Sequence, residues 1–152
     1  MEYRPRERGL GRPGQRDERR ESERGLRQEE KERIAKIMNG DTRELVKYAE
    51  EKGKELYNKE LTPSQIRNVF GEVKKIQMQE FDPERLLLLN YKLVYAASRP
   101  GSKLGTKEMK DILIEAIHHV NDSPERFERF CNFFEALLAY RQEAEKERGK
   151  KR

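Results

Sequence analysis

The chain has 152 residues, of which 41% are charged and 34% hydrophobic, and its formal net charge is +5. This length fits one domain with a modest core, and we expect neither a membrane span nor a signal peptide because the apolar stretches are too short. The single cysteine, Cys131, excludes an intramolecular disulfide, so the composition predicts a soluble protein of the reducing cytoplasm.

The excess positive charge lies at the two ends of the chain. Residues 1–33 hold 11 basic and 9 acidic side chains and residues 141–152 hold 6 and 3, whereas residues 34–140 hold 17 of each. A central region without net charge binds a polyanion only through local basic patches. We expect a charged, partly disordered extension over 1–33, a helical bundle domain over 34–142 and a charged tail over 143–152.

Two alternatives stay open for the charged residues 17–33. They either form no stable structure, in which case deleting residues 1–27 leaves the melting temperature nearly unchanged, or they join a helix over residues 17–38. Such a helix would dock on the domain through its apolar residues Ile34, Ile37 and Met38.

The first two helices of the domain are predicted from their N-terminal signals. Asp41 and Glu44 have the spacing of a capping box, and Thr62 is a suitable N-cap before Pro63. Spacings of three and four then give the second helix one apolar face. That face consists of Ile66, Val69, Phe70, Val73 and Ile76.

Asp82 and Pro83 start a third helix, which ends at Pro100 and Gly101. Its sequence, LLLLNYKLVYAA, is apolar on nearly every side, which predicts a buried central helix.

The last two helices start at Thr106 and at Ser123-Pro124, and both carry a clear apolar stripe. No segment alternates with a period of two for long enough to form a strand. The sequence therefore predicts an all-α protein, a compact bundle of about five helices. The stripes are Met109, Ile112, Leu113, Ala116, Ile117 and Val120 in the first and Phe127, Phe130, Cys131, Phe134, Leu137 and Leu138 in the second.

The candidates for chemistry are weak. Glu115 and His118 have the Glu-x-x-His spacing of di-iron proteins, but no second such motif exists, and His118 and His119 fit surface residues better. Cys131 lies among phenylalanines, as an inert core cysteine does. No phosphate-binding glycine loop follows a strand. We expect no enzyme, no metal and no cofactor.

Basic side chains are more informative. Arg67, Lys74 and Lys75 lie opposite the apolar face of the second helix, and Lys92 stands within an otherwise apolar helix. Arg99 ends that helix, and Arg141 follows the aromatic run of the last one. An ordinary solvated surface and an RNA-binding surface both explain these charges, so charge alone leaves both open.

Three blocks resemble a known family in their order and spacing. They are LTPSQIRNVFGEVKKIQ, NYKLVYAASR and FERFCNFFEALLAYRQ, and together they cover about residues 61–142. The blocks resemble the small subunit (Csm2 family) of the type III-A CRISPR effector, the Csm complex. Residues 1–60 carry no motif of this family.

The resemblance implies a small helical subunit without nuclease activity, several copies of which stack in a filament beside the subunits that hold the crRNA. It implies positive side chains that face the crRNA–target RNA duplex, at Arg67, Lys92 and Arg99, with a further basic residue at Arg141. Lys74 and Lys75 extend this set by helix geometry. Such a subunit contacts the RNA backbone, because the guide RNA supplies sequence recognition. The implied partners are crRNA, target RNA, the other Csm subunits and further copies of the chain.

A different reading is a self-associating structural helical protein without a nucleic-acid role. The zero net charge of residues 34–140 supports it. A single face containing Arg67, Lys92 and Arg99 favours RNA. We also expect Phe133 and Tyr140, which lie off the main apolar stripe, to contact a partner protein.

Overall fold

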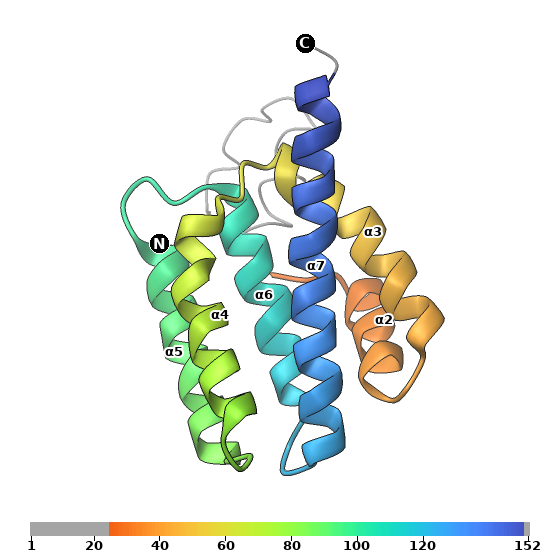
Figure 1. Cartoon of the computed structure of the whole chain (residues 1–152), viewed down its shortest axis with the longest axis vertical. Helices are drawn as coiled ribbons and strands as arrows, with labels where there is room; N and C mark the ends of the chain where they lie inside the picture. Colours follow the sequence, from red (N-terminus) through yellow and green to blue (C-terminus); the bar gives the residue numbers. More distant parts are fainter. Residues whose placement is uncertain (1–24, 151–152) are drawn as a thin grey trace, which may run out of the picture.

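The computed structural model describes residues 25–150, which contain six α-helices and no strand (Figure 1). The all-α class predicted from the sequence is confirmed. None of these helices is both long and apolar enough to cross a membrane. The helices are α2 (Gln28–Met38), α3 (Thr42–Asn58), α4 (Pro63–Met78), α5 (Pro83–Ser98), α6 (Leu104–His118) and α7 (Pro124–Lys150).

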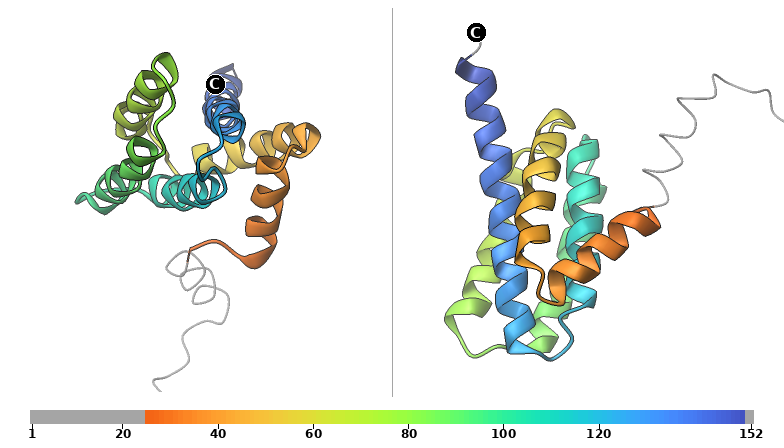
Figure 2. Two further views of the ribbon diagram at one scale, coloured as in Figure 1. Left: turned by 90° about the horizontal axis from the view of Figure 1, so that it is seen from below. Right: turned by 90° about the vertical axis from the view of Figure 1, so that its right-hand side faces the viewer.

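α7 runs through the middle of the bundle, with α3 on one side and α4 on the other (Figure 1). Seen from its end, the bundle has α5 at one edge, and α2 crosses the others near the opposite edge (Figure 2). A glycine permits the close packing of α3 on α7. A Cβ atom on Gly53 would lie only 2.6 Å from Cβ of Tyr140 and 2.8 Å from the backbone nitrogen of Arg141.

The core is built around aromatic rings of α7. The Phe130 and Phe134 rings lie 6.1 Å apart between centroids, and Phe134 also contacts Phe70 of α4 at 5.2 Å. Phe133, which we expected to contact a partner protein, is fully buried against Tyr48 of α3, so that prediction is wrong. The reason is that α7 is covered from both α3 and α4, so its buried face is wider than one apolar stripe.

α5 is an edge helix, and its prediction as the buried central helix is wrong. Leu86, Leu89 and Leu93 face α4 and α6 and are buried, but the opposite side of the helix is exposed. An apolar sequence on every side of a helix indicates that all of its sides can be buried. It does not indicate whether the same chain or another molecule buries them. The exposed large apolar residues of α5 are Leu87, Leu88, Tyr91, Val94 and Tyr95.

Most of the predicted helix starts are confirmed by capping hydrogen bonds. The Asp41 carboxylate accepts the Glu44 amide at 3.0 Å, and the Ser123 hydroxyl accepts the Arg126 amide at 3.2 Å. Thr62 makes no capping hydrogen bond, contrary to expectation, and Pro63 alone marks the start of α4. α6 begins at Leu104, two residues before the expected start.

The docking predicted in the second alternative for the N-terminal region is confirmed, but a continuous helix over residues 17–38 is wrong because residues 25–27 are not helical. α2 begins at Gln28 and docks through Ile34, Ile37 and Met38, all of them buried. Leu26, just before the helix, also packs against the core, so a deletion through residue 27 would remove a packed side chain. Residues 17–24 of the predicted helix lie outside the described residues.

A buried lysine ties α2 and α6 to α3. The Lys52 ammonium is 2.7 Å from a Glu108 oxygen, 3.0 Å from a Glu55 oxygen and in direct contact with Glu30. Burial opposes its charge, but Tyr48 and the carboxylates outweigh burial and raise the pKa of Lys52. The aliphatic part of the side chain is covered while the charge is fully paired, which is how a lysine becomes buried at low cost.

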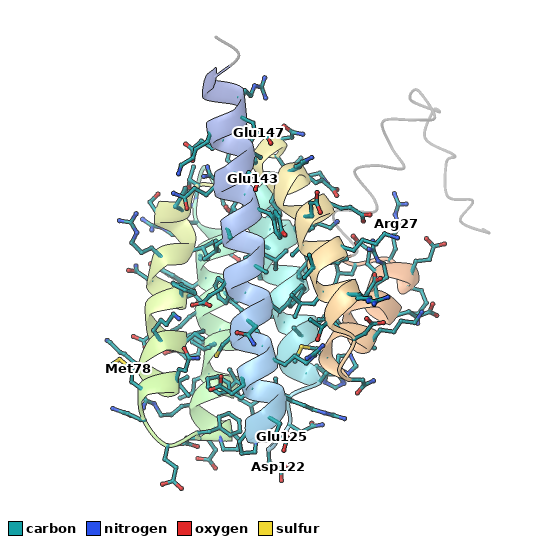
Figure 3. All side chains as sticks on the ribbon, turned by 45° about the vertical axis from the view of Figure 1, so that its right-hand side comes forward. Arg27, Met78, Asp122, Glu125, Glu143 and Glu147 are labelled. Atoms are coloured by element: carbon teal, nitrogen blue, oxygen red, sulfur yellow. The ribbon has the colours of Figure 1, made fainter. Side chains whose placement is uncertain are left out.

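At the other end of the chain, α7 continues well beyond the core. Residues 143–149, assigned above to a charged tail, are helical and mostly exposed. Glu143 and Glu147 are exposed on this extension (Figure 3). The division of the chain into extension, domain and tail stays a prediction.

Candidate nucleic-acid interface

The helices α4 and α5 form an antiparallel hairpin at one side of the bundle (Figure 1). The face of α4 that packs inward carries Ile66, Val69 and Val73. Its outward face is polar and carries Arg67, Asn68 and Lys75, all exposed. Arg67 and Lys75 are eight residues apart, so they lie on one side of the helix, about two turns from each other.

Glu72 joins the two helices of this hairpin. Its carboxylate lies 3.4 Å from the Lys92 ammonium of α5 and 3.6 Å from the Lys75 ammonium of α4. A small desolvation raises the pKa of the Glu72 carboxyl, but the hydrogen bonds and charges of Lys92 and Lys75 outweigh it and lower the pKa. Lys92 thus reaches the seam between α4 and α5, where its side chain is 36% exposed.

Arg99 lies at the end of α5 and is exposed there, just before a turn in which Gly101 takes a φ of 81°. The contact between Glu72 and Lys92 shows which residues of the two helices are level with each other. By that register Arg99 is level with the first turn of α4, and Arg67 is level with the last turn of α5. Arg67 and Arg99 therefore share one end of the hairpin, and Lys92 lies about 10 Å further along.

Arg67 and Arg99 are the two unpaired cations of this set. Neither guanidinium makes an ion pair or a hydrogen bond within the part of the chain that the structure describes. Two exposed arginines at one end of a hairpin present fork-shaped donors suited to phosphate oxygens.

Lys74 and Arg141 are placed differently from the other predicted residues. Lys74 is turned toward α7, where it pairs with Glu135 and lies 5.2 Å from the centre of the Phe70 ring. Arg141 is buried, donates from Nε to the Leu61 carbonyl oxygen at 3.0 Å and pairs with Glu145. Its guanidinium also covers the Tyr57 ring at 5.3 Å. These contacts hold helices together, so the side chains of Lys74 and Arg141 are already engaged within the bundle.

The other chemical candidates lie away from this hairpin. Nε2 of His119 is 3.5 Å from Glu115, and no group of three potential metal ligands occurs within residues 25–150. Cys131 is buried as expected, and desolvation, followed by the charge of Glu128, raises the pKa of its thiol to about 12. A cavity of about 540 Å³ between α2, α3 and α6 is lined by Lys52 and Lys59, both already paired with carboxylates.

Sequence reasoning missed Asn68 and the exposed tyrosines of α5. Asn68 follows Arg67 on the outward face of α4, which the helical spacing alone could have identified. Tyr91 and Tyr95 are 59% and 71% exposed, but an apolar sequence on all sides of the helix gave no signal for which residues face solvent.

The chain was compared with protein families, curated proteins and solved structures. A family model described as Csm2 Type III-A matches residues 39–147, which span α3 to most of α7 and include all three sequence blocks. Searches of curated proteins and of solved structures found no significant match. The matched region contains the α4–α5 hairpin with Arg67, Lys75, Lys92 and Arg99. Because the match covers more than half of the chain, the chain belongs to the Csm2 family and is a small subunit of a type III-A CRISPR Csm complex.

Proposed function

We propose that this subunit contacts the backbone of the crRNA–target RNA duplex through the hairpin surface, defined as Arg67, Lys75, Lys92 and Arg99. The observation that carries the proposal is the pair of exposed, unpaired arginines, Arg67 and Arg99, at one end of the α4–α5 hairpin, judged over the described residues. Such cations gain more from a phosphate partner than cations already paired with carboxylates do.

The contact is independent of base sequence. Lysine and arginine side chains on helix surfaces reach phosphate oxygens, and each contact releases counterions from the nucleic acid. Base pairing between guide and target supplies the sequence recognition, so the subunit needs no base-reading pocket. The surface holds no catalytic arrangement, and we propose a non-catalytic role in holding the duplex, without a cofactor.

Lys92 has a specific part in this proposal. The Lys92 ammonium already pairs with the Glu72 carboxylate, and Lys75 pairs with the same carboxylate. A nearby phosphate would therefore replace the contact between Lys92 and Glu72 only in part. Lys92 and Lys75 therefore supply a smaller share of the affinity than Arg67 and Arg99 do.

We further propose that several copies stack in a filament beside the subunits that hold the crRNA, in the reducing cytoplasm. The family membership supports this assembly. Repetition along the duplex suits a weak, backbone-only contact, since linked weak contacts add in avidity.

A structural self-associating role without RNA contact is the second candidate. The exposed apolar side of α5 and the absence of net charge over residues 34–140 favour it. The two candidates differ in their salt dependence, because apolar association lacks the counterion release of phosphate binding.

The test uses the assembled complex reconstituted with the variant Arg67→Ala/Lys92→Ala/Arg99→Ala. Target-RNA affinity should fall, and the slope of log affinity against log salt should decrease by about 0.7–0.9 for each phosphate contact removed. The matched control is Arg43→Ala/Lys47→Ala/Lys54→Ala, which removes three exposed charges from α3. Circular dichroism verifies the fold of both variants. Equal slopes for the two triple variants and the wild type would refute the proposal.

A further inference from the structure

One side of α5 is an apolar surface that the described part of the chain leaves uncovered. Its five large apolar side chains are between 47% and 71% exposed. Elsewhere within residues 25–150, the exposed large apolar residues occur singly on other helices, as Met78 does at the end of α4 (Figure 3). Single residues of this kind are ordinary, whereas a contiguous stripe marks an interaction surface. We call Leu87, Leu88, Tyr91, Val94 and Tyr95 the α5 stripe.

The α5 stripe has a symmetric spacing. Leu87 and Tyr95 are each four residues from Tyr91, and Leu88 and Val94 are each three residues from it. If two α5 helices pair antiparallel with their Tyr91 residues opposite each other, Leu87 of each copy faces Tyr95 of the other, and Leu88 faces Val94. A surface that is complementary to itself about a two-fold axis is what an isologous dimer requires.

The charges at the ends of the stripe select the antiparallel arrangement. Glu84 is exposed in the first turn of α5, and Arg99 is exposed at the end of the helix. They lie seven and eight residues from Tyr91, which is about 10 and 12 Å along the axis. Each Glu84 of an antiparallel pair therefore lies beside Arg99 of the other copy, whereas a parallel pair would put like charges together. Arg85 donates a hydrogen bond to Gln79 and so points to the flank of α5.

We propose that α5 pairs antiparallel with α5 of a second copy of this chain, across a two-fold axis near Tyr91. A whole tyrosine side chain buries about 150 Å² or more, and Tyr91 and Tyr95 are already partly covered, so pairing the two stripes gives an interface at or below the lower limit of about 1,200 Å² for specific complexes. A weak, concentration-dependent dimer follows. A two-fold dimer of this kind is closed, so it differs from the open filament of stacked copies proposed above.

The inference does not rest on the proposed RNA contact, although Arg99 belongs to both surfaces. Its test therefore uses the full-length chain free of nucleic acid and of other subunits, in analytical ultracentrifugation over a range of concentrations. The wild type should show a monomer–dimer equilibrium. A wild type that stays monomeric up to about 1 mM, the limit of weak association, would overturn the proposal.

Tyr91→Glu tests the centre of the stripe. Two carboxylates would face each other across the axis, so the dissociation constant should rise about 100-fold or more. Val46→Glu is the control, because Val46 is another exposed apolar residue but lies on α3. The control should dimerise as the wild type does. A dimer unaffected by Tyr91→Glu, or weakened as strongly by Val46→Glu, would contradict the assignment of the interface.

A charge exchange tests the register. Glu84→Arg alone and Arg99→Glu alone should each weaken the homodimer about threefold to tenfold, since each creates two repulsive contacts. An equimolar mixture of the two variants should recover wild-type affinity as a heterodimer, because every Arg then faces a Glu. The double variant should recover it as well. If neither the mixture nor the double variant recovered the wild-type dimer affinity, the antiparallel register would be excluded, whatever the result of the RNA-binding experiment.

Discussion

Gly53 lies where α3 is in direct contact with the backbone of α7, and Gly53→Ala tests how tightly that contact determines the fold. An added Cβ would lie 2.6 Å from Cβ of Tyr140 and 2.8 Å from both the carbonyl carbon of Tyr140 and the nitrogen of Arg141. These are backbone and Cβ atoms, which cannot rotate away as the end of a long side chain does. The two helices must therefore separate along the region where they pack most extensively.

Two opposing effects determine the magnitude. Overpacking a well-packed contact costs about 1–3 kcal/mol, and the rigidity of these neighbours favours the upper half of that range. Alanine in a helix interior is favoured over glycine by about 1 kcal/mol, which offsets part of the cost. We expect a net loss of about 1–2 kcal/mol in the free energy of unfolding, and a fall in melting temperature of about 4–8 °C.

Gly71→Ala is the matched control for this experiment. Gly71 also lies within a helix, α4, but a Cβ at that position has no neighbouring atom within 4 Å among the described residues. Only the propensity effect then remains, so this variant should be more stable than the wild type by about 0.5–1 kcal/mol. Urea and thermal unfolding followed by circular dichroism measure both variants. If Gly53→Ala were as stable as Gly71→Ala, the close packing of α3 on α7 would be refuted.

Three further predictions concern Lys52, Glu55 and Cys131. Lys52→Met should lower the free energy of unfolding by about 3 kcal/mol in urea titrations, since Glu30 and Glu108 lose a buried partner; an unchanged stability would contradict the buried network. Desolvation raises the pKa of Glu55, but the hydrogen bonds and charges of Lys59 and Lys52 outweigh desolvation and lower the pKa to about 2. The stabilisation by Glu55 is therefore present above the unfolded pKa of 4.5 and is lost as the pH falls toward 2. The difference in melting temperature between wild type and Glu55→Gln should shrink over that range and stay constant from pH 5 to 7. Cys131, whose thiol has a pKa of about 12, should react with a thiol reagent at pH 8 only at the rate of unfolding, so labelling as fast as that of a free thiol would place it at the surface.

The sequence predicts the helices better than it predicts their positions in the bundle. Caps at Asp41 and Ser123 and the apolar spacing of α6 and α7 are local signals, and the structure confirms them. The place of α5 is not a local property. An apolar helix can be covered by its own chain or by another molecule, and the two cases have the same sequence pattern.

The same distinction separates the basic residues. Arg67 and Arg99 are exposed as predicted, since nothing distant in sequence reaches them within the described residues. Arg141 is buried because the Leu61 carbonyl, 80 positions away, lies beside it, and Lys74 pairs with Glu135 across the α4–α7 contact. Contacts over such separations follow from packing, so no local motif could have identified them.

The central claim is that the outward face of the α4–α5 hairpin touches RNA, and photo-crosslinking tests it most directly. Asn68, exposed beside Arg67, is replaced by a benzophenone-bearing amino acid in the otherwise wild-type subunit, and Lys47 on α3 is replaced in the control. The complex is assembled with labelled crRNA and target RNA and then irradiated. We predict crosslinks to RNA from position 68 and none above background from position 47. Crosslinks from position 68 only to protein subunits, with none to either RNA, would contradict the claim.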